Sequence, residues 1–419
     1  MYRLFGDPPR ALGFRHSDQH EAGEEGELRI ATLRALLIPP GPSALSLLAA
    51  LEGVIDGRDA PLVPVPSADP RECEALTDGL RVGEPIDDDI ALVVSTSGTT
   101  GEPKGAMLTA AALVGGASGT HDRLGGPGTW LLALPSHHIA GIQVLVRSVL
   151  AGTVPAEVDL TDGFEPSALT AAVAEMTGTR RYTALVANQL AKALADPAAS
   201  AALAELDAVL LGGGPAPQPV LDAAAEAGVT VVRTYGSSET AGGCVYDGLP
   251  LDGVAVRIDD PGPSGEGRIV VGGATVAKGY RNPPAPDPFT EKGWFRTDDR
   301  GRIDEAGLLR VTGRLDDGIS SGGLTIMPAE VEAVLIRHPA LADCAVFGVD
   351  DDRLGQRVAA AVVLAPGRPA PTLDELREFV CQSLDHTAAP RDLHVLDELP
   401  RRGIGKLDRR ALRAQVTNQ

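Results

Sequence analysis

Residues 94–105 read Val-Ser-Thr-Ser-Gly-Thr-Thr-Gly-Glu-Pro-Lys-Gly and follow directly on the apolar run 91–94. The apolar run predicts a buried strand that ends in hydroxyl residues and glycines, and a helix is expected to begin near Thr109. Gly98, Gly101 and Gly105 let backbone N–H groups approach a ligand, the hydroxyls add donors, and Lys104 adds a positive charge. This combination predicts a binding loop for a polyphosphate.

The position of Lys104 separates this loop from the common phosphate-binding loop. There the lysine is followed by Ser or Thr and stands on the first turn of the helix, whereas here Pro103 and Gly105 flank Lys104 and predict a lysine within the loop. Ordinary P-loop nucleotide hydrolases are therefore disfavoured. A flexible Ser/Thr/Gly connector is the alternative, and the ordered run after a strand argues against it.

Composition and charge restrict the class of protein. The 419 residues suggest two or three domains. The formal net charge of −20 argues against broad contact with nucleic acid or anionic membranes, and no apolar run approaches a membrane span or a signal peptide, so we expect a soluble protein. The cysteines form no C-x-x-C pair, which indicates neither a zinc site nor a disulfide framework and favours a reduced, cytoplasmic location. They are Cys73, Cys244, Cys344 and Cys381.

The rest of the chain predicts three successive kinds of structure. Apolar strand patterns at 130–135, 182–187, 208–211 and 229–232 alternate with helical patterns, which predicts mostly parallel sheets with ligands beyond the strands' carboxyl ends. Short β segments at 253–258, 267–271 and 302–311 predict a β-rich subdomain. The predicted fold class is therefore α/β, with a large N-terminal domain of flanked parallel sheets plus that subdomain (1–314) and a small mobile α+β C-terminal domain (315–419).

A second chemical motif follows the strand at 229–232. Tyr235 can stack on a flat base, small hydroxyls can donate to phosphate, and the carboxylate of Glu239 can hold Mg²⁺ against phosphate oxygens. A capped helix start, Ser with Glu nearby, is the alternative for the segment taken alone. The presence of the first loop favours a nucleotide site.

Together, the two segments resemble the adenylate-forming enzymes, which include acyl-CoA synthetases, adenylation domains of peptide synthetases and luciferases. The second segment is similar to the family's Tyr-Gly-x-Thr-Glu signature, with Ser238 in place of Thr. The resemblance assigns Tyr235 to adenine, Ser238 to phosphate and Glu239 to Mg²⁺. Further ATP-binding residues that it implies are Ser97, Gly98, Thr99, Thr100, Gly101, Lys104, Gly213, Gly214 and Gly236.

Two later segments extend the resemblance. Residues 294–299 resemble the family's Trp-Tyr/Phe-x-Thr-Gly-Asp motif, whose Asp accepts both ribose hydroxyls; Asp299 matches it, and Asp298 stands where Gly is expected. A turn-forming Asp pair is the alternative. In the border segment 312–332, Arg314 would contact the ribose and Asp316 would be the hinge between the domains. The same segment can also be interpreted as a Gly/Ser linker before a helix that begins near Pro328.

Three residues of the border segment and one near the chain end complete the resemblance. Ser321, Gly322 and Gly323 would border the tunnel for a thiol. Lys406 would orient the carboxylate and the α-phosphate. A lysine in a basic tail is otherwise usually a solvated surface residue.

The acid substrate is indicated by the turn at 134–141. The resemblance places His138 at the mouth of an acyl pocket, whereas a metal site or a structural histidine are the alternatives. With Gln143, Arg147 and the short chain, the turn resembles the o-succinylbenzoate-CoA ligases of menaquinone synthesis. That substrate has two carboxylates, so the one that is not activated needs a cation, for which Arg147 is our hypothesis. A surface or salt-bridged arginine is the alternative.

The resemblance implies an ATP-dependent acid–thiol ligase that makes acyl-AMP and transfers the acyl group to CoA. Lys104, Lys406 and Glu239 would be catalytic, Mg²⁺ the cofactor, and ATP and CoA co-substrates. Alternatives are another aryl- or short-chain acyl-CoA ligase, an adenylation enzyme that loads a carrier protein, and a nucleotide-binding protein without turnover. The expected partners are a small carboxylic acid and CoA, with no nucleic acid, no stable membrane insertion and a possible homodimer.

Overall fold

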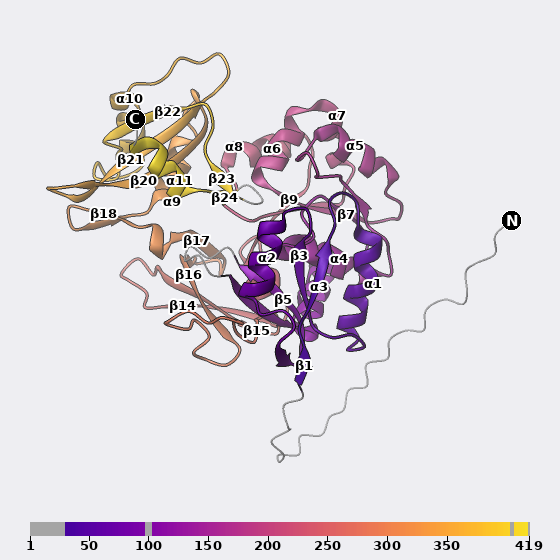
Figure 1. Ribbon diagram of the computed structural model, residues 1–419. Coiled ribbons are helices and arrows are strands. Elements are labelled where there is room, and N and C mark those ends of the chain that lie inside the picture. Colours follow the sequence, from indigo (N-terminus) through magenta and orange to yellow (C-terminus); the bar gives the residue numbers. More distant parts are fainter. Residues whose placement is uncertain (1–29, 97–102, 403–405, 418–419) are drawn as a thin grey trace.

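The computed structural model describes residues 30–96, 103–402 and 406–417 (Figure 1). Of Arg402, Lys406 and Thr417 only the backbone is described. The predicted phosphate-binding residues that lie outside the described ones are Ser97, Gly98, Thr99, Thr100 and Gly101.

The first sheet contains the strand predicted ahead of the phosphate motif. Its strand order is β2-β3-β5-β6, in which β2, β3 and β5 are parallel and β6 is antiparallel to β5. These strands are β2 (Arg34–Ile38), β3 (Leu62–Pro66), β5 (Ile90–Thr96) and β6 (Lys104–Thr109). A separate antiparallel pair is formed by β1 (Ile30–Thr32) and β4 (Pro85–Asp87). The helices here are α1 (Ala44–Ile55), α2 (Pro70–Gly79) and α3 (Ala110–Arg123).

The prediction that Lys104 lies within a loop is wrong. Lys104 is the first residue of β6 and pairs with Thr96 of β5. The physical reason lies in the residues that follow, because Ala106 and Leu108 are completely buried and alternate with Met107, the period-two pattern of a strand. Helix α3 then begins at the expected place, with Thr109 as its N-cap.

A seven-stranded sheet forms the centre of the large domain. Its order is β13-β12-β11-β10-β9-β7-β8; the strands from β8 to β11 are parallel, and β12 and β13 are antiparallel additions. The strands are β7 (Thr129–Leu132), β8 (Ala156–Glu157), β9 (Arg181–Val186), β10 (Ala208–Gly212), β11 (Val231–Ser237), β12 (Gly242–Tyr246) and β13 (Leu249–Pro250). The predicted mostly parallel sheets are confirmed, but β11 begins later than predicted and extends through the tyrosine motif to Ser237.

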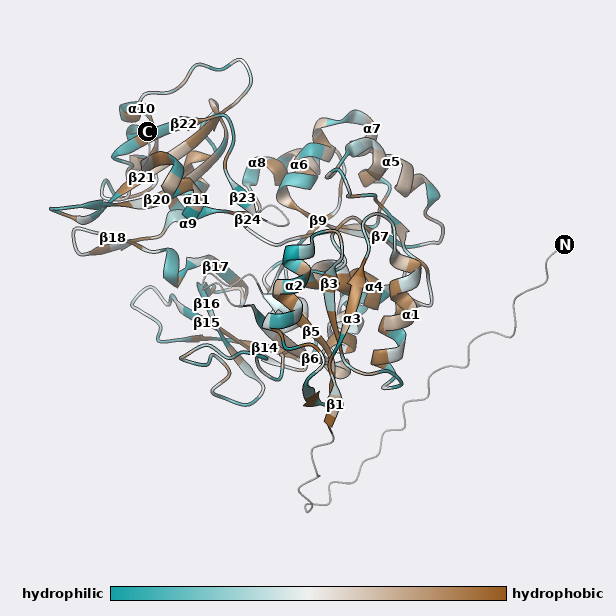
Figure 2. Ribbon diagram, viewed as in Figure 1, coloured by the Kyte–Doolittle hydropathy of each residue, from teal (hydrophilic) through white to brown (hydrophobic). Residues whose placement is uncertain are grey.

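Helices cover both faces of this sheet because its buried side chains alternate in direction. Trp130 and Leu132 pack towards α1, α3 and α4, whereas Leu131 packs into a second core with α5 to α7. The helices and the short 3₁₀ turn η1 are α4 (Ile139–Ala151), α5 (Pro166–Glu175), α6 (Ala187–Ala195), α7 (Pro197–Ala204), α8 (Gln218–Glu226) and η1 (Ser238–Thr240). Figure 2 shows hydrophobic residues along the strands labelled β3 and β5, between the helices.

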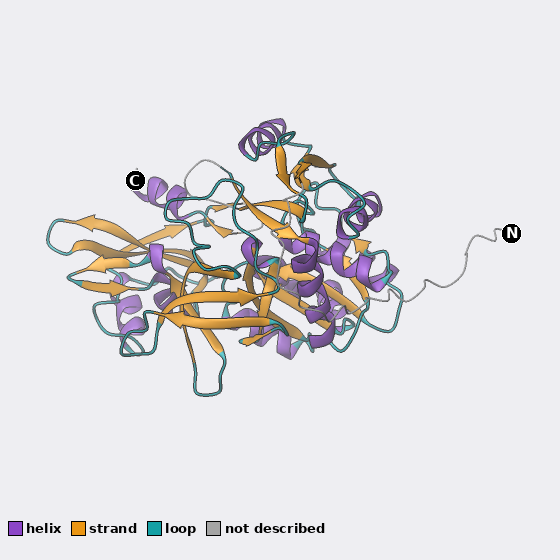
Figure 3. Ribbon diagram, turned by 90° about the horizontal axis from the view of Figure 1, so that it is seen from below, coloured by secondary structure: helices purple, strands orange, loops and turns teal. Residues whose placement is uncertain are grey.

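The predicted β-rich part is an antiparallel sheet in the order β14-β15-β16-β17. Its strands are β14 (Val254–Asp259), β15 (Gly267–Gly273), β16 (Trp294–Ile303) and β17 (Leu309–Arg314). The single β segment predicted at 302–311 is wrong, since a turn at Asp304 separates β16 from β17. In Figure 3 the long strands extend to the left of the view, accompanied by a few helices, and most of the helices lie to the right.

The C-terminal part is a small α+β unit, as predicted. It begins with the 3₁₀ turn η2 (Leu315–Asp317), and β21 in its sheet pairs with β18, β20 and β22. The strands are β18 (Ile319–Ser321), β19 (Leu324–Ile326), β20 (Leu341–Asp351), β21 (Gly355–Leu364) and β22 (Asp392–Leu396), with the separate pair β23 (Arg401–Arg402) and β24 (Lys406–Leu407). The helices are α9 (Pro328–Leu335), α10 (Leu373–Cys381) and α11 (Arg409–Thr417).

The interpretation of the Gly/Ser-rich part of segment 312–332 as a plain linker is wrong. β18 and β19 form a hairpin with Gly322 and Gly323 as its two turn residues, at φ of 60° and 83°. Two successive residues with positive φ are what a tight type I′ hairpin turn requires. The boundary that we predicted after residue 314 falls between β17 and η2 and stays a prediction. Among the described residues, no helix is both long and apolar enough to span a bilayer.

Two glycines on neighbouring helices provide a test of the packing around α4. A Cβ at Gly141 would lie 2.3 Å from the Pro135 carbonyl oxygen, whereas a Cβ at Gly115 would meet nothing closer than Ala274, at 3.7 Å. We expect Gly141→Ala to destabilise the protein by about 1–3 kcal/mol and Gly115→Ala to stabilise it by about 0.5–1 kcal/mol. Thermal unfolding of both variants measures the difference. Equal midpoints for the two would contradict this packing.

Candidate active site

The predicted adenine and ribose residues come together from three strands. The Tyr235 hydroxyl on β11 donates to the Asp299 carboxylate on β16 at 2.8 Å, and Arg314 at the end of β17 lies 3.6 Å from the same carboxylate. Burial raises the pKa of Tyr235 well above its usual value, so the phenol remains a donor. Burial also raises the pKa of Asp299, while Tyr235 and Arg314 act against that rise. The arrangement presents a half-buried carboxylate held by two donors, which suits the acceptance of two hydroxyl groups.

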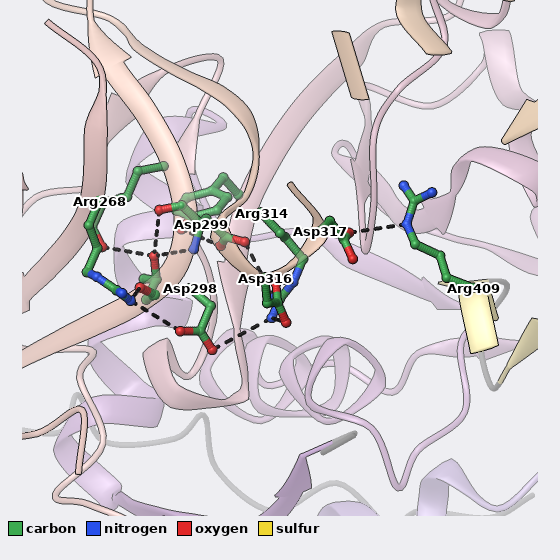
Figure 4. Close-up of polar contacts among 10 residues, drawn as sticks. Arg268, Asp298, Asp299, Arg314, Asp316, Asp317 and Arg409 are labelled. Atoms are coloured by element: carbon green, nitrogen blue, oxygen red, sulfur yellow. Dashed lines mark hydrogen bonds and ion pairs between the residues drawn. The ribbon is translucent and has the colours of Figure 1, made fainter. Parts of the chain in front are cut away.

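Figure 4 shows that Arg314 lies among three carboxylates at the joint between β17 and η2. Its guanidinium donates to both oxygens of Asp316 at 2.9 Å and lies 3.7 Å from Asp298. Asp298 stands where the family motif has Gly, and β16 continues through it without interruption. Its carboxylate pairs with Arg268 at 3.1 Å. The predicted hinge residue Asp316 is therefore in direct contact with the predicted ribose contact Arg314.

The predicted phosphate and magnesium residues lie around η1 and the facing end of the first sheet. Glu239, on η1, is buried, and its carboxylate accepts a 2.5 Å hydrogen bond from the Tyr280 hydroxyl. The Lys104 ammonium lies 5.5 Å from the centre of the Tyr280 ring. Ser238 donates to the Ser95 carbonyl at 3.5 Å, which places the tyrosine motif directly beside the end of β5.

These residues fit Mg·ATP. Magnesium sites on nucleotides typically use one or two carboxylates together with phosphate oxygens and waters. Glu239 is a suitable carboxylate, and no cluster of three or more His, Cys, Asp or Glu side chains occurs in the described ranges, so a site made by the protein alone is not indicated there. The buried Ser237 hydroxyl has no hydrogen-bond partner among the described residues and is available to a phosphate. The metal would supply charge neutralisation on the phosphates.

The predicted glycines differ in what they do. Gly213 and Gly214 are exposed beyond the carboxyl end of β10, the neighbour of β11, and no atom lies within 4 Å of a Cβ added at Gly214. A Cβ at Gly236 would lie 2.0 Å from the Gly242 carbonyl oxygen, so only glycine fits at this register shift in the antiparallel pairing of β11 with β12. Gly236 is thus required by the backbone.

The predicted acyl-pocket residues lie along α4. Gln143 is buried and donates to the Ala241 carbonyl at 2.7 Å, just after η1. Arg147, one turn further, is 3% exposed; it donates to the Tyr246 hydroxyl at 3.3 Å and lies over the Trp130 ring at 4.8 Å. His138 is the N-cap residue of α4, with its ring 4.3 Å from that of His137. The structure therefore brings Gln143 and Arg147 to one face of the helix and His138 to its start.

The remaining predicted residues belong to the C-terminal part. Ser321 is buried in β18, and Gly322 and Gly323 form the hairpin turn. The positive φ angles of this turn are enough to explain the two glycines without a role in binding. Lys406 of β24 pairs through its backbone with Arg402 of β23. The side chain of Lys406 is not among the parts that the structure describes. The roles assigned to these residues stay predictions.

Several residues at the site were not predicted from the sequence. Tyr280 holds Glu239, and His121, Trp130 and Tyr246 surround Arg147. Trp130 and Tyr246 stand in apolar runs that indicated only packing. Tyr280 stands in Gly-Tyr-Arg-Asn, a recognisable signal, but its partner Glu239 is 41 residues away and could not be inferred.

Comparison with known proteins identifies the family. The sequence profile of the AMP-binding enzyme family matches residues 45–281, and that of the AMP-binding enzyme C-terminal domain matches residues 330–406. The chain belongs to the AMP-binding enzyme family. It is 62% identical over 382 residues to a probable 2-succinylbenzoate–CoA ligase of Mycobacterium tuberculosis, a match that covers 91% of this chain and 97% of that protein.

Solved structures agree with this family membership. The o-succinylbenzoate CoA synthetase MenE of Bacillus subtilis, in complex with the acyl-adenylate intermediate OSB-AMP, is 28% identical with a TM-score of 0.72, covering 91% of this chain and 88% of that chain. The same synthetase in complex with ATP and magnesium ion is 30% identical with a TM-score of 0.70, covering 91% and 89%. The predicted adenylate-forming family and fold class are confirmed.

The contact between Tyr280 and Glu239 generates a test of the magnesium site. Removal of the hydroxyl in Tyr280→Phe leaves the buried carboxylate without its donor, so we expect the Mg²⁺ concentration for half-maximal ATP binding to rise roughly tenfold. Calorimetric titration of ATP at several Mg²⁺ concentrations measures it. Tyr182→Phe is the matched control, because Tyr182 donates only to the Leu124 and Gly126 carbonyls. An unchanged Mg²⁺ requirement in Tyr280→Phe would show that this contact does not position Glu239.

Proposed function

We propose that the chain ligates 2-succinylbenzoate to CoA at the expense of ATP, the reaction expected in menaquinone biosynthesis. The observation that carries the choice of acid is Arg147, a buried cation without a carboxylate partner among the described residues, one helical turn beyond Gln143. Relatives named as 2-succinylbenzoate–CoA ligases, in Mycobacterium tuberculosis and in Bacillus cereus, support the same acid.

In the first half-reaction a substrate carboxylate oxygen attacks the α-phosphorus of ATP. The bond from that phosphorus to the bridging oxygen breaks, and acyl-AMP and pyrophosphate form. Tyr235, Asp299 and Arg314 hold the nucleoside, so the α-phosphate is presented next to η1. Lys104 and the proposed Lys406 offset negative charge on the phosphates. Glu239 would hold a Mg²⁺ ion, which would supply further charge neutralisation there when bound.

In the second half-reaction the CoA thiol sulfur attacks the acyl carbon. The mixed anhydride bond breaks, AMP leaves, and the thiol proton passes to solvent. We propose that the C-terminal part rotates about Asp316 between the two steps, which withdraws Lys406 and admits the thiol beside Ser321. The position of Asp316 in η2, between β17 and the C-terminal sheet, supports a hinge there.

The unpaired charge of Arg147 supports a substrate acid with two carboxylates. A buried guanidinium without a carboxylate is costly, and a bound carboxylate would offset that cost. Arg147 is neither exposed nor salt-bridged within the described ranges, which removes both alternatives given for it from the sequence. A dicarboxylic acid can place one carboxylate at the α-phosphate and the other at Arg147, whereas a fatty acid would leave Arg147 unpaired. Cytoplasmic location and a homodimer stay predictions.

Incubation of the purified protein with Mg·ATP, CoA and each of three acids tests the reaction. We expect pyrophosphate, AMP and a thioester from 2-succinylbenzoate, and at least roughly a hundredfold less from benzoate or a fatty acid. Pyrophosphate release without consumption of CoA would instead favour transfer to a carrier protein. A better yield from another acid would refute the assignment of substrate, and no pyrophosphate from any acid would refute the ligase itself.

Replacement of Arg147 by Met separates a binding role from a structural one. Met retains most of the apolar stem and removes a buried charge, so the melting temperature should stay unchanged or rise. The KM for 2-succinylbenzoate should increase roughly tenfold or more, because a charge-assisted hydrogen bond to the substrate is lost. Steady-state kinetics and thermal unfolding measure the two effects. A fall in melting temperature with an unchanged KM would make Arg147 a structural residue.

A further inference from the structure

A short segment after β15, residues 278–282, lies along the outer edge of β6. The Met107 N–H donates to the Gly279 carbonyl at 2.9 Å. Further along, the Arg281 N–H donates to the Gly105 carbonyl at 2.8 Å. We call residues 278–282 the strap. Because β6 is the last strand of the first sheet, the strap supports it on the side opposite β5.

The last residue of the strap, Asn282, is bonded to the chain just before Lys104. Its half-buried side-chain amide donates to the Pro103 carbonyl at 3.0 Å and to the Gly79 carbonyl at the end of α2. The Pro103 carbonyl belongs to the peptide group that joins Pro103 to Lys104. Asn282 therefore ties the backbone of Lys104 to α2 and to the strap at the same time.

The residues on both sides of Lys104 are closely packed. A Cβ at Gly79 would lie 2.8 Å from Cδ of the Pro103 ring, so the ring lies directly against the end of α2. A Cβ at Gly105 would lie 2.4 Å from Cγ1 of Val93 on β5. Because interiors of this kind leave little free space, a shift of the Lys104 backbone would require α2 or β5 to move.

The strap also holds the charged groups that are proposed to act on the phosphates. The Tyr280 hydroxyl donates to the Glu239 carboxylate, and the Lys104 ammonium lies 5.5 Å from the centre of the Tyr280 ring. Tyr280 thus contacts the carboxylate and lies near the cation. Asn282, two residues further on, fixes the backbone from which that cation extends. One segment of five residues therefore sets the position of Lys104 relative to Glu239.

We propose that Asn282 is a positioning residue for Lys104 and that it serves the first half-reaction alone. The inference rests on the proposed function and deepens it. The resemblance assigns Lys406 to the α-phosphate, which leaves Lys104 for the two phosphates that depart. These are present on ATP in the first half-reaction, whereas acyl-AMP retains only the α-phosphate in the second. A displaced Lys104 therefore slows the release of pyrophosphate and leaves attack by the thiol unaffected.

Rapid mixing measures the two half-reactions separately. Pyrophosphate release is followed after Mg·ATP and 2-succinylbenzoate meet the enzyme. Thioester formation is followed after CoA meets enzyme that already holds acyl-AMP, loaded in the presence of pyrophosphatase. In Asn282→Leu, which keeps the size of the side chain and removes both donors, we expect the rate constant for pyrophosphate release to fall roughly tenfold. The rate constant for thioester formation should stay at the wild-type value.

Lys278→Met is the matched control, because it removes a side-chain anchor at the other end of the strap. The Lys278 ammonium lies 2.9 Å from the carboxylates of Asp87 and Asp89. Both rate constants should remain at their wild-type values in this variant. An equal selective loss of pyrophosphate release in Lys278→Met would mean that the strap as a whole, and not Asn282, positions Lys104, and would overturn the proposal.

The other outcomes are also distinct. A structural role for Asn282 lowers both rate constants in parallel or changes neither, and either result would overturn the proposal. Absence of pyrophosphate release by the wild-type protein with 2-succinylbenzoate would overturn the proposed function instead.

A second variant keeps the proposal testable if Asn282→Leu fails to fold. Gly79→Ala places a methyl group against the Pro103 ring and puts a better helix former at the end of α2. We expect the same selective loss of pyrophosphate release, because the methyl group displaces Pro103 and with it Lys104. Gly115→Ala, with no such close neighbour, is the control. Equal rate constants in Gly79→Ala and Gly115→Ala would contradict the positioning of Lys104 through Pro103.

Discussion

The close antiparallel pairing of β11 and β12, with a register shift between Tyr235 and Gly236, is the constraint on which both halves of the site depend. Only glycine fits at 236, because a Cβ would meet the Gly242 carbonyl oxygen at 2.0 Å, and the chain reverses through η1 with Ala241 at a φ of 51°. This reversal places Tyr235 and Glu239 on the nucleotide side. It also directs the Ala241 carbonyl to Gln143, at 2.7 Å, on the acyl side. A single backbone turn thus sets the distance between the nucleotide and the acid.

The two sides of this turn handle charge in opposite ways. On the nucleotide side, the partly exposed Arg314 is surrounded by Asp298, Asp299 and Asp316, and the carboxylate of Asp299 is left to accept hydroxyl groups. On the acyl side, Arg147 is buried without a carboxylate among the described residues. Because burial of an unpaired charge costs several kcal/mol, the acyl side is electrostatically incomplete without an anion, whereas the nucleotide side is complete in itself. If Arg147 binds the acid as proposed, selection of the acid depends on this unpaired buried charge.

The sequence was most informative where chemistry and backbone conformation coincide in one short segment. The resemblance assigned Tyr235, Asp299 and Arg314 to one nucleotide, and the structure brings the three side chains together, while their roles stay predictions. The strand at Lys104 was missed because the glycines and hydroxyls before it masked the alternation at Ala106 and Leu108. The hairpin at Gly322 and Gly323 was interpreted as a linker for the same reason: glycine indicates a special backbone without specifying which one. Contacts such as Tyr280 with Glu239 depend on packing between distant elements, which periodicity cannot supply.

The strengths of the ion pairs at the domain border differ in a way that suits movement there. The Arg314–Asp316 pair is about half exposed on both sides, and pairs of that kind contribute only about 0.2–1 kcal/mol, so its loss during a rotation costs little. Arg409 of α11, in contrast, is mostly buried and contacts Asp317, Glu332 and the Val346 carbonyl, all of which lie beyond Asp316 in the chain. The buried contacts hold the C-terminal part together as a unit. A rotation about Asp316 would therefore break the weak pair and leave the strong ones intact, because the joint lies between them.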